Sequence, residues 1–391
     1  MSRLHFLSAG ESHGPCLTAI VEGLPAGLPV DVERVNHDLR RRQVGYGRGG
    51  RSQIEHDQVE ILGGVIGGLS TGAPIALRVE NRDWANWSAH WAANDLPPLT
   101  IPRPGHADYA GMVKYGLDDS RPILERASAR ETAMRVAVGA LARLLLAQFG
   151  VAVGSCVTEI GGIVTHLQDL PPAELWNLAD ASDVRCPNEE AAAAMRAAID
   201  QARRDGDSLG GCFVVTATGV PVGLGTHVHW ERRLDACLAA AMMSIPAIKG
   251  VEIGPAFENA RCPGTQVHDE FLPVPGMDAG SVPGTGWRAL ALTGAGVMRA
   301  SNRAGGIEGG MSNGQPIVVR AAMKPIPTTI RPLRSVDLAT GQAASTQYQR
   351  SDVCAVPAAS VVGEAMMAWV LADALLDKLG GDSLAEMRQR R

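Results

Sequence analysis

Lysine is scarce in this 391-residue chain, where it occurs only at positions 114, 249, 324 and 378. Positive charge is therefore carried mostly by arginine, whose planar guanidinium can hold a carboxylate or phosphate through two parallel hydrogen bonds. The net charge is −5, which disfavours broad binding to nucleic acid or to an anionic membrane. Aromatic residues make up only 4% of the chain and offer few stacking platforms for single strands. Because the chain is acidic overall and poor in lysine and aromatic residues, we expect its arginines to act at local sites and not across a broad binding surface.

The seven cysteines are scattered and form no C-x-x-C pair. Neither a disulfide framework nor a zinc site is indicated, and we expect no metal. The N-terminus lacks the apolar core of a signal peptide, and we find no run of about eighteen apolar residues. A protein that is cytoplasmic and not anchored in a membrane fits best. With 46% hydrophobic residues and no obvious linker, residues 1–391 are predicted to form one domain.

Periodicity predicts several helices and strands, with tight glycine and proline turns between them. Helices are predicted over residues 31–43, 129–149, 188–205, 231–244 and 357–379. Strands are predicted near residues 14–22, 58–66, 73–80, 151–158, 212–222 and 316–323. Strands outnumber helices, which favours a layered α+β fold over a doubly wound parallel sheet.

One internal repeat is visible in the sequence. Residues 63–79, GGVIGGLSTGAPIALRV, match residues 305–321, GGIEGGMSNGQPIVVRA, with nine of seventeen positions identical at a constant offset of 242. A glycine-rich turn that leads into a strand thus occurs twice, which predicts duplicated halves. Convergent turn composition is the alternative explanation.

Four arginines lie between positions 121 and 135, although the chain as a whole is acidic. Ser128 and Glu131 have the spacing of a capping box, which predicts that a helix begins there and ends before Gly150. A helix N-terminus presents free N–H groups, so Arg126 and Arg130 indicate a site for a small anion. The alternative is a surface helix with i,i+4 ion pairs, but Arg126 and Arg130 are themselves like charges at that spacing.

Two histidines lie in glycine-containing turns, His13 in GESHG and His106 in PGHAD. Either could transfer a proton near neutral pH. A second arginine cluster, residues 40–51, contains several glycines. It could be a basic arm for nucleic acid or a lid that closes on a phosphorylated or carboxylated substrate.

Two later segments complete the set of polar candidates. Lys324 to Thr329 offers a cation with two hydroxyls, and Asp352 lies near Arg350 as either a surface ion pair or a base. The glycine-rich run 305–314 follows neither a dinucleotide nor a Walker A pattern.

Nine motifs occur in order over nearly the whole chain and resemble the chorismate synthase family closely. The motifs are ESHG at 11–14, GYGRGGR at 45–51, RPGHAD at 103–108, ERASARETAMRVA at 125–137, GDSLGG at 206–211, KGVEIG at 249–254, NRAGGIEGGMSNG at 302–314, KPIPT at 324–328 and RSDVCAVPAA at 350–359. The resemblance implies a β-α-β sandwich with internal duplication, two pseudo-symmetric halves and a homotetramer. It also implies conversion of 5-enolpyruvylshikimate 3-phosphate to chorismate by 1,4-trans elimination of phosphate, with reduced FMN required although the reaction is redox-neutral.

The same resemblance implies roles for individual residues. His13 matches the histidine near the leaving phosphate, His106 the histidine that protonates the reduced flavin, and Asp352 the carboxylate near flavin N5. Arg42 and Arg48 match positions for substrate or pyridine nucleotide, and Arg51, Arg103 and Arg130 resemble clamps for the substrate's phosphate and carboxylates. The implied FMN contacts are Arg126, Ala127, Ser128, Pro246, Ala247, Gly309, Lys324, Pro325, Ile326, Pro327, Thr328 and Arg350. Pro246 departs from the polar residue of some relatives, so a backbone contact is expected there.

Two other classes compete with this interpretation. One is a non-catalytic binder of RNA or another polyanion, and the other is a flavin-dependent reductase, which the absence of a dinucleotide fingerprint disfavours. The sequence leaves open whether NADPH reduces the flavin on this protein or an external reductant does so.

Overall fold

The computed structural model describes residues 3–50, 54–167, 169–274, 297–349 and 351–390. Its first sheet has the strand order β1-β2-β6-β3 and is antiparallel throughout. The strands are β1 (His5–Ala9), β2 (Cys16–Glu22), β3 (Val59–Gly63) and β6 (Ile75–Glu80). Alternate residues of β2 and β6 are buried, because successive side chains of a strand point to opposite faces of the sheet.

The second sheet has the order β10-β15-β9-β7-β8 and is also antiparallel. Its strands are β7 (Ala152–Ile160), β8 (Ile163–Val164), β9 (Gly211–Thr218), β10 (Ile248–Ile253) and β15 (Ile317–Met323). Neither sheet is parallel, so the predicted α+β class of mixed helix and sheet is confirmed.

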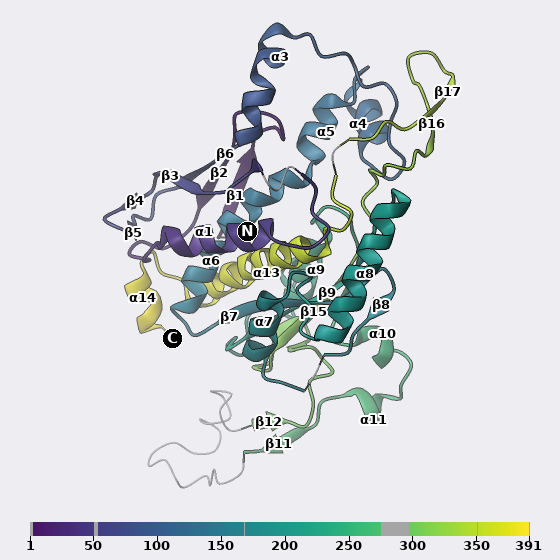
Figure 1. Ribbon diagram of the computed structural model, residues 1–391. Coiled ribbons are helices and arrows are strands. Elements are labelled where there is room, and N and C mark those ends of the chain that lie inside the picture. Colours follow the sequence, from purple (N-terminus) through teal and green to yellow (C-terminus); the bar gives the residue numbers. More distant parts are fainter. Residues whose placement is uncertain (1–2, 51–53, 168, 275–296, 350, 391) are drawn as a thin grey trace.

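Four helices fill the space between the two sheets (Figure 1). They are α1 (Val32–Gln43), α6 (Thr132–Ala147), α9 (Leu234–Met243) and α13 (Val356–Leu379). Helix α6 packs on β2 and β6, α13 packs on β7 and β9, and the two helices pack on each other. The apolar core is therefore centred on α6 and α13.

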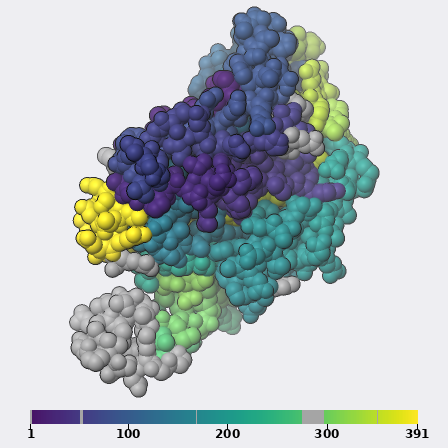
Figure 2. Space-filling view, turned by 60° about the vertical axis from the view of Figure 1, so that its left-hand side comes forward, coloured from purple at the N-terminus to yellow at the C-terminus, as the bar shows by residue number. Residues whose placement is uncertain are grey.

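The remaining elements lie around these layers. Short helices are η1 (Arg82–Asn86), α3 (Ser88–Ala93), α4 (Asp108–Tyr115), α5 (Arg121–Ala127), η2 (Ala129–Glu131), α7 (Pro172–Ala181), η3 (Trp230–Arg232), α10 (Ala256–Asn259), α11 (Gly264–Val267) and α14 (Leu384–Gln389), together with the longer α8 (Glu189–Asp205). Hairpins are β4 (Val65–Ile66) with β5 (Leu69–Ser70), β11 (Phe271–Pro273) with β12 (Val297–Arg299), β13 (Ile307–Glu308) with β14 (Met311–Ser312), and β16 (Arg334–Val336) with β17 (Ala343–Ser345). The C-terminal segment, yellow in Figure 2, lies against the N-terminal part through backbone hydrogen bonds of Ala26 with Asp382 and Leu384.

The five predicted helices are present, with small shifts at their ends. The helix predicted at 129–149 begins as the 3₁₀ turn η2, whose first residues are capped when Ser128 Oγ accepts a hydrogen bond from Arg130 N at 3.3 Å. The Glu131 carboxylate pairs one turn later with Arg135 Nε at 2.8 Å, so the predicted reciprocal capping box is replaced by an i,i+4 ion pair. Helix α6 ends at Ala147, and Gly150 follows with φ of 76°.

The sequence repeat corresponds to a repeated local structure. Hairpin β4–β5 leads into β6, and hairpin β13–β14 leads into β15 at the same offset. Both turns place two consecutive glycines at positive φ, 59° and 79° at Gly67 and Gly68, and 58° and 83° at Gly309 and Gly310. Ser70 Oγ donates to Pro25 O and accepts from Leu28 N, and the residue of the second copy, Ser312, makes the same two contacts with Pro221 and Leu224. Convergent turn composition would not by itself reproduce these side-chain contacts, so they favour duplication as the origin of the repeat.

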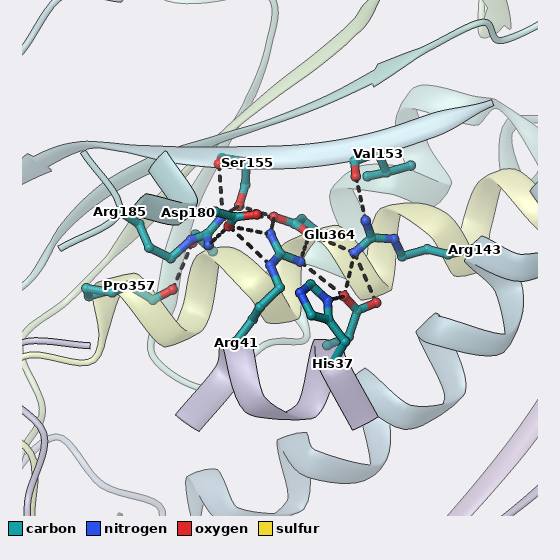
Figure 3. A network of polar contacts seen from close by, with 11 residues as sticks. His37, Arg41, Arg143, Val153, Ser155, Asp180, Arg185, Pro357 and Glu364 are labelled. Atoms are coloured by element: carbon teal, nitrogen blue, oxygen red, sulfur yellow. Dashed lines mark hydrogen bonds and ion pairs between the residues drawn. The ribbon is translucent and has the colours of Figure 1, made fainter. Parts of the chain in front are cut away.

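Helix α13 contains no unbroken run of eighteen apolar residues, but by length and average hydropathy it could span a membrane, and 78% of its apolar window is buried inside the protein. Among the charged residues of this helix, Glu364 is fully buried, and its hydrogen-bond partners compensate for the loss of water around the carboxylate. Glu364 accepts hydrogen bonds from Arg41, Arg143, Arg185 and Ser155 at 2.6–3.0 Å (Figure 3). Burial would raise the pKa of Glu364, but the three arginines lower it to about 2.

Candidate active site

The central helices begin at a cavity of about 930 Å³. Thr132 and Arg135 of α6 and Ala358 and Val362 of α13 line it, as does Ala355 at the N-cap of α13. Both N-termini direct the positive end of a helix dipole toward the same space. The small side chains of α13 keep that space open.

The cavity wall carries more positive than negative charge. Its described lining contains eight cations, namely Arg42, Arg48, Arg103, Arg121, Arg126, Arg130, Arg135 and Lys324. It contains four acids, namely Glu55, Glu125, Glu131 and Asp352. The difference, eight minus four, is an excess of four positive charges before either histidine is counted. Such a wall is suited to a ligand with several negative charges.

Two of the arginines are fixed by a buried carboxylate beneath the cavity. Asp57 accepts from Arg42 Nη2 at 2.7 Å and from Arg130 Nη1 at 2.5 Å, and Arg130 Nε also donates to Asn81 Oδ1 at 2.7 Å. Burial raises the pKa of Asp57, but the two arginines lower it further than burial raises it. Burial, with the charges of Arg130 and Arg48, lowers the pKa of Arg42 against the opposing effect of Asp57. Arg130 is thus largely occupied by the protein, and its predicted role as a substrate clamp stays a prediction.

Asp352 contacts the glycine-rich loop between α1 and β3. Its carboxylate accepts from Arg48 Nη1 at 2.5 Å and from the backbone N–H of Gly49 at 2.7 Å. The partner predicted from sequence, Arg350, lies outside the described residues, and so does Arg51. Asp352 therefore fixes the orientation of Arg48 toward the cavity.

Three buried guanidinium nitrogens at the cavity, Nε of Arg42, Arg48 and Arg121, have no hydrogen-bond partner within the described ranges. A buried donor without a partner costs about 1–3 kcal/mol. These Nε atoms are themselves buried, so a ligand in the cavity would reach them only if the arginine side chains moved.

His106 belongs to a cluster with Arg103 and Asp108. Its Nδ1 lies 2.5 Å from Asp108 Oδ1, and Arg103 Nε donates to Asp108 Oδ2 at 2.8 Å. Burial would raise the pKa of Asp108, but its hydrogen bonds with His106 and Arg103 hold it well below its usual range. Arg103 also donates to Thr328 Oγ1 at 3.0 Å, which links this cluster to the 324–328 segment.

His13 reaches the cavity from the turn between β1 and β2. Its Nδ1 lies 2.7 Å from Glu125 Oε1, and its ring stacks on Trp87 with centroids 4.2 Å apart. The neighbouring Ser12 donates to Ser128 Oγ at 2.9 Å. The N-terminal turn is in this way fixed to the start of the predicted anion-binding helix.

Most of the residues that the resemblance assigns to the flavin line this cavity. They are Arg126, Ala127, Ser128, Pro246, Ala247, Lys324, Ile326, Pro327 and Thr328. Ala247 has a positive φ of 68°, unusual for a residue other than glycine, and its carbonyl accepts from Lys324 N at 2.9 Å. This strained contact joins two predicted flavin segments at the cavity wall.

Two predicted flavin contacts are not brought to the cavity of the same chain. Pro325 is not part of its lining, and Gly309 lies in the β13–β14 turn. That turn precedes β15, whereas Lys324 follows it, and seven residues of strand span about 20 Å. The turn therefore lies away from the cavity of this chain, and the positive φ angles that the hairpin requires explain its glycines.

Sequence reasoning missed several residues that line the cavity or lie beneath it. Asp57 and Trp87 carried no motif signal, since a single Asp or Trp in a loop is ambiguous. Glu125 stands at the start of ERASAR, but the roles predicted for that motif fall on Arg126, Ala127, Ser128 and Arg130. Asp57 contacts Arg42 and Arg130, and Trp87 and Glu125 contact His13. Most of these pairs are far apart in the sequence.

Comparison with known proteins agrees with this geometry. A family model described as chorismate synthase matches residues 4–376. A chorismate synthase from Chlorobaculum tepidum is 53% identical over 99% of this chain and 96% of its own length, and one from Streptomyces coelicolor is 52% identical over 100% and 97%. A solved structure, "Crystal Structure of Chorismate Synthase", superposes with a TM-score of 0.75 and 44% identity over 99% of this chain and 96% of that one. The chain belongs to the chorismate synthase family, enzymes that catalyse the final step of the shikimate pathway.

Proposed function

We propose that the cavity binds 5-enolpyruvylshikimate 3-phosphate beside reduced FMN, and that the protein catalyses 1,4-trans elimination of phosphate to give chorismate. The observation that carries the proposal is a cavity whose lining has four more cations than acids, or two more when the adjoining Asp57 and Asp108 are counted, and which also contains two carboxylate-paired histidines. A substrate with one phosphate and two carboxylates, next to a flavin phosphate, supplies the negative charge that such a lining attracts.

The residues present fit a flavin mononucleotide as well as the substrate. At about 930 Å³ the cavity is near the upper end of the range for small-molecule sites, roughly 300–1,000 Å³. Arg126, Ser128, Ala247 and Lys324 line the cavity and would hold the flavin. When bound, reduced FMN supplies an electron-rich ring that can lend electron density as phosphate departs.

The protein's own groups would bind charge and move protons. Arg48 and Arg103 would hold substrate carboxylate and phosphate groups, each pre-oriented by a carboxylate behind it. His13 would donate a proton to the departing phosphate, and His106 would exchange a proton with the flavin edge. Asp352 would take up the proton that the substrate ring loses.

We further propose one domain over residues 1–391 with two pseudo-symmetric halves in a β-α-β sandwich. The strand order of the two sheets supports this. Read from β7, the second sheet has the order β7-β9-β15-β10, and its strands follow one another in the chain and pair in the same way as β1-β2-β6-β3 of the first sheet. The central helices lie between the two sheets. The family resemblance supports a cytoplasmic homotetramer with a small-molecule substrate and no nucleic-acid or membrane partner. It also leaves NADPH as one source of reduced flavin.

An anaerobic assay tests the function. Chorismate should form from 5-enolpyruvylshikimate 3-phosphate with FMN and dithionite, with many turnovers for each flavin. Turnover with oxidised FMN in air and no reductant would overturn the flavin requirement. A parallel reaction with FMN and NADPH alone shows whether the protein reduces its own flavin, since product then forms only if it does.

A further inference from the structure

One residue, Glu125 of α5, contacts the Ser12–His13 turn three times across 112 positions of sequence. Its backbone carbonyl accepts from Ser12 N at 3.1 Å. Its Oε2 accepts from the backbone N–H of His13 at 2.7 Å, and its Oε1 lies 2.7 Å from His13 Nδ1. The Glu125 side chain is only 3% exposed, so these contacts are shielded from water.

The chemistry of the two groups fixes where the imidazole proton lies. An ionised carboxylate only accepts hydrogen bonds, so the short Oε1···Nδ1 contact requires a hydrogen on Nδ1. The second ring nitrogen, Nε2, is then the atom that can carry or release a proton at a ligand. Stacking on Trp87 at 4.2 Å limits rotation of the ring out of this orientation.

We propose that Glu125 is a positioning residue that holds His13 as the Nδ1–H tautomer with Nε2 available for proton transfer in the cavity. The proposal deepens the function given above and rests on it for the role of His13. In this tautomer Nε2 is the free acceptor: it takes up a proton, passes it to a ligand in the cavity and returns to its starting state, while Nδ1–H stays bonded to Glu125.

Glutamine at position 125 makes a sharp test. The backbone N–H of His13 is a donor only, so the amide oxygen of the variant must face it. The amide NH2 group then faces Nδ1, which must become an acceptor. Glu125→Gln is therefore expected to invert the tautomer of His13 and place its hydrogen on Nε2, from which a neutral imidazole is a very weak acid.

His106 offers a less clean test of the same kind. Asp108 holds its Nδ1, but the same carboxylate also accepts from Arg103. A change at Asp108 would move a cavity arginine together with the histidine. The pair His90 and Asp95 is the matched control, because Nδ1 and Oδ1 are 3.0 Å apart while both side chains are more than half exposed and neither lines the cavity.

The experiment uses full-length protein labelled with ¹⁵N-histidine, without ligand, and a His13→Asn variant to assign the signals. Long-range ¹H–¹⁵N spectra distinguish protonated from unprotonated ring nitrogens. We expect the Nδ1–H form of His13 in the wild type and in Glu125→Asp, and the Nε2–H form in Glu125→Gln. In the anaerobic assay, kcat of Glu125→Gln should fall about 10²-fold or more, with FMN affinity within a few-fold, and Glu125→Asp should recover part of the rate. Asp95→Asn should change neither His13 nor kcat.

An Nε2–H tautomer in the wild type would overturn the proposal without any variant of Glu125, even if Glu125→Gln proved unable to fold. An inverted tautomer with an unchanged kcat would overturn the catalytic consequence. Failure of the proposed function looks different: the wild type would then make no chorismate, while its spectra would still report which ring nitrogen of His13 is protonated.

Discussion

Two regions of this molecule are rich in arginine, and they use it in opposite ways. Around Glu364, between the sheets, Arg41, Arg143 and Arg185 share carboxylates with short contacts (Figure 3). In the cavity lining, cations outnumber acids by four, and they still do so by two when Asp57 and Asp108 behind the lining are counted. Arginine that the protein neutralises stabilises the fold, and arginine left in excess marks where ligand charge is expected.

The two regions meet at consecutive residues of α1. Arg41 donates to Glu364 and Arg42 donates to Asp57 at the cavity. Successive residues of an α-helix point about 100° apart, so one helix end can supply both regions. This arrangement predicts that changes in the first region affect stability and that changes in the second affect ligand binding and turnover.

The largest effect is expected for Glu364→Gln. It leaves the buried Arg185 and the half-buried Arg41 and Arg143 without their shared charge, and removal of one partner of a buried ion pair costs about 3–5 kcal/mol. Chemical denaturation measures this loss in the free energy of unfolding. Asp180→Asn is the matched control, because Asp180 contacts Arg41 and Arg185 in the same network but is 38% exposed, and it should cost about 1 kcal/mol or less. Equal losses in the two variants would contradict the assignment of the buried charge to Glu364.

Acid should remove the same contribution from the wild type. The pKa of Glu364 is lowered from 4.5 to about 2 in the folded chain. A lowered pKa means that the ionised group stabilises the fold fully above pH 4.5, and this contribution is lost as the pH falls from 4.5 toward 2. The gap in unfolding free energy between the wild type and Glu364→Gln should therefore narrow over this window. A gap that stays constant down to pH 2 would show that charge is not its source.

At the cavity, Asp352→Asn should lower kcat at least about a hundredfold, or about 2.7 kcal/mol, with FMN affinity within a few-fold. Because Asp352 holds Arg48 at 2.5 Å, its effect should not add to that of Arg48→Ala. A double-mutant cycle on kcat/KM should give a coupling free energy of about 0.5–3 kcal/mol. Additive effects would mean that Asp352 acts independently of Arg48.

Local patterns predicted much of the fold. Helical periodicity located α1, α8 and α13 within a residue or two, and the 242-residue offset located both glycine hairpins. Helix α5 was missed because its seven residues end at the cap of the next helix, which interrupts any periodic pattern.

The candidate site was predicted less completely, because its important pairs are distant in sequence. His13 was recognised from its glycine turn, but Glu125 lies 112 positions away, and Glu364 lies 323 positions from Arg41. A buried carboxylate is recognisable in a sequence only when its partners are close. The excess charge of the cavity likewise depends on which arginines the fold neutralises, as it does for Arg130 through Asp57.

The smallest change is expected for Arg126→Ala, which separates ligand binding from stability most cleanly. Arg126 lines the cavity but is exposed, and within the described ranges it donates hydrogen bonds to the backbone carbonyl and the hydroxyl of Ser8. Loss of a charge-assisted contact to the flavin should weaken FMN binding by about ten- to a hundredfold, or about 1.5–3 kcal/mol, measured by flavin titration with substrate present. The free energy of unfolding should stay within about 0.5 kcal/mol of the wild type, because no buried partner is left behind. Arg126→Lys should restore part of the affinity, since the charge returns without the planar fork. Arg232→Ala, which breaks an exposed pair with Asp377 away from the cavity, should leave FMN binding unchanged. If Arg126→Ala instead unfolded the protein and bound FMN normally, Arg126 would belong with the paired arginines of the first region, and the distinction between the two regions would fail at this residue.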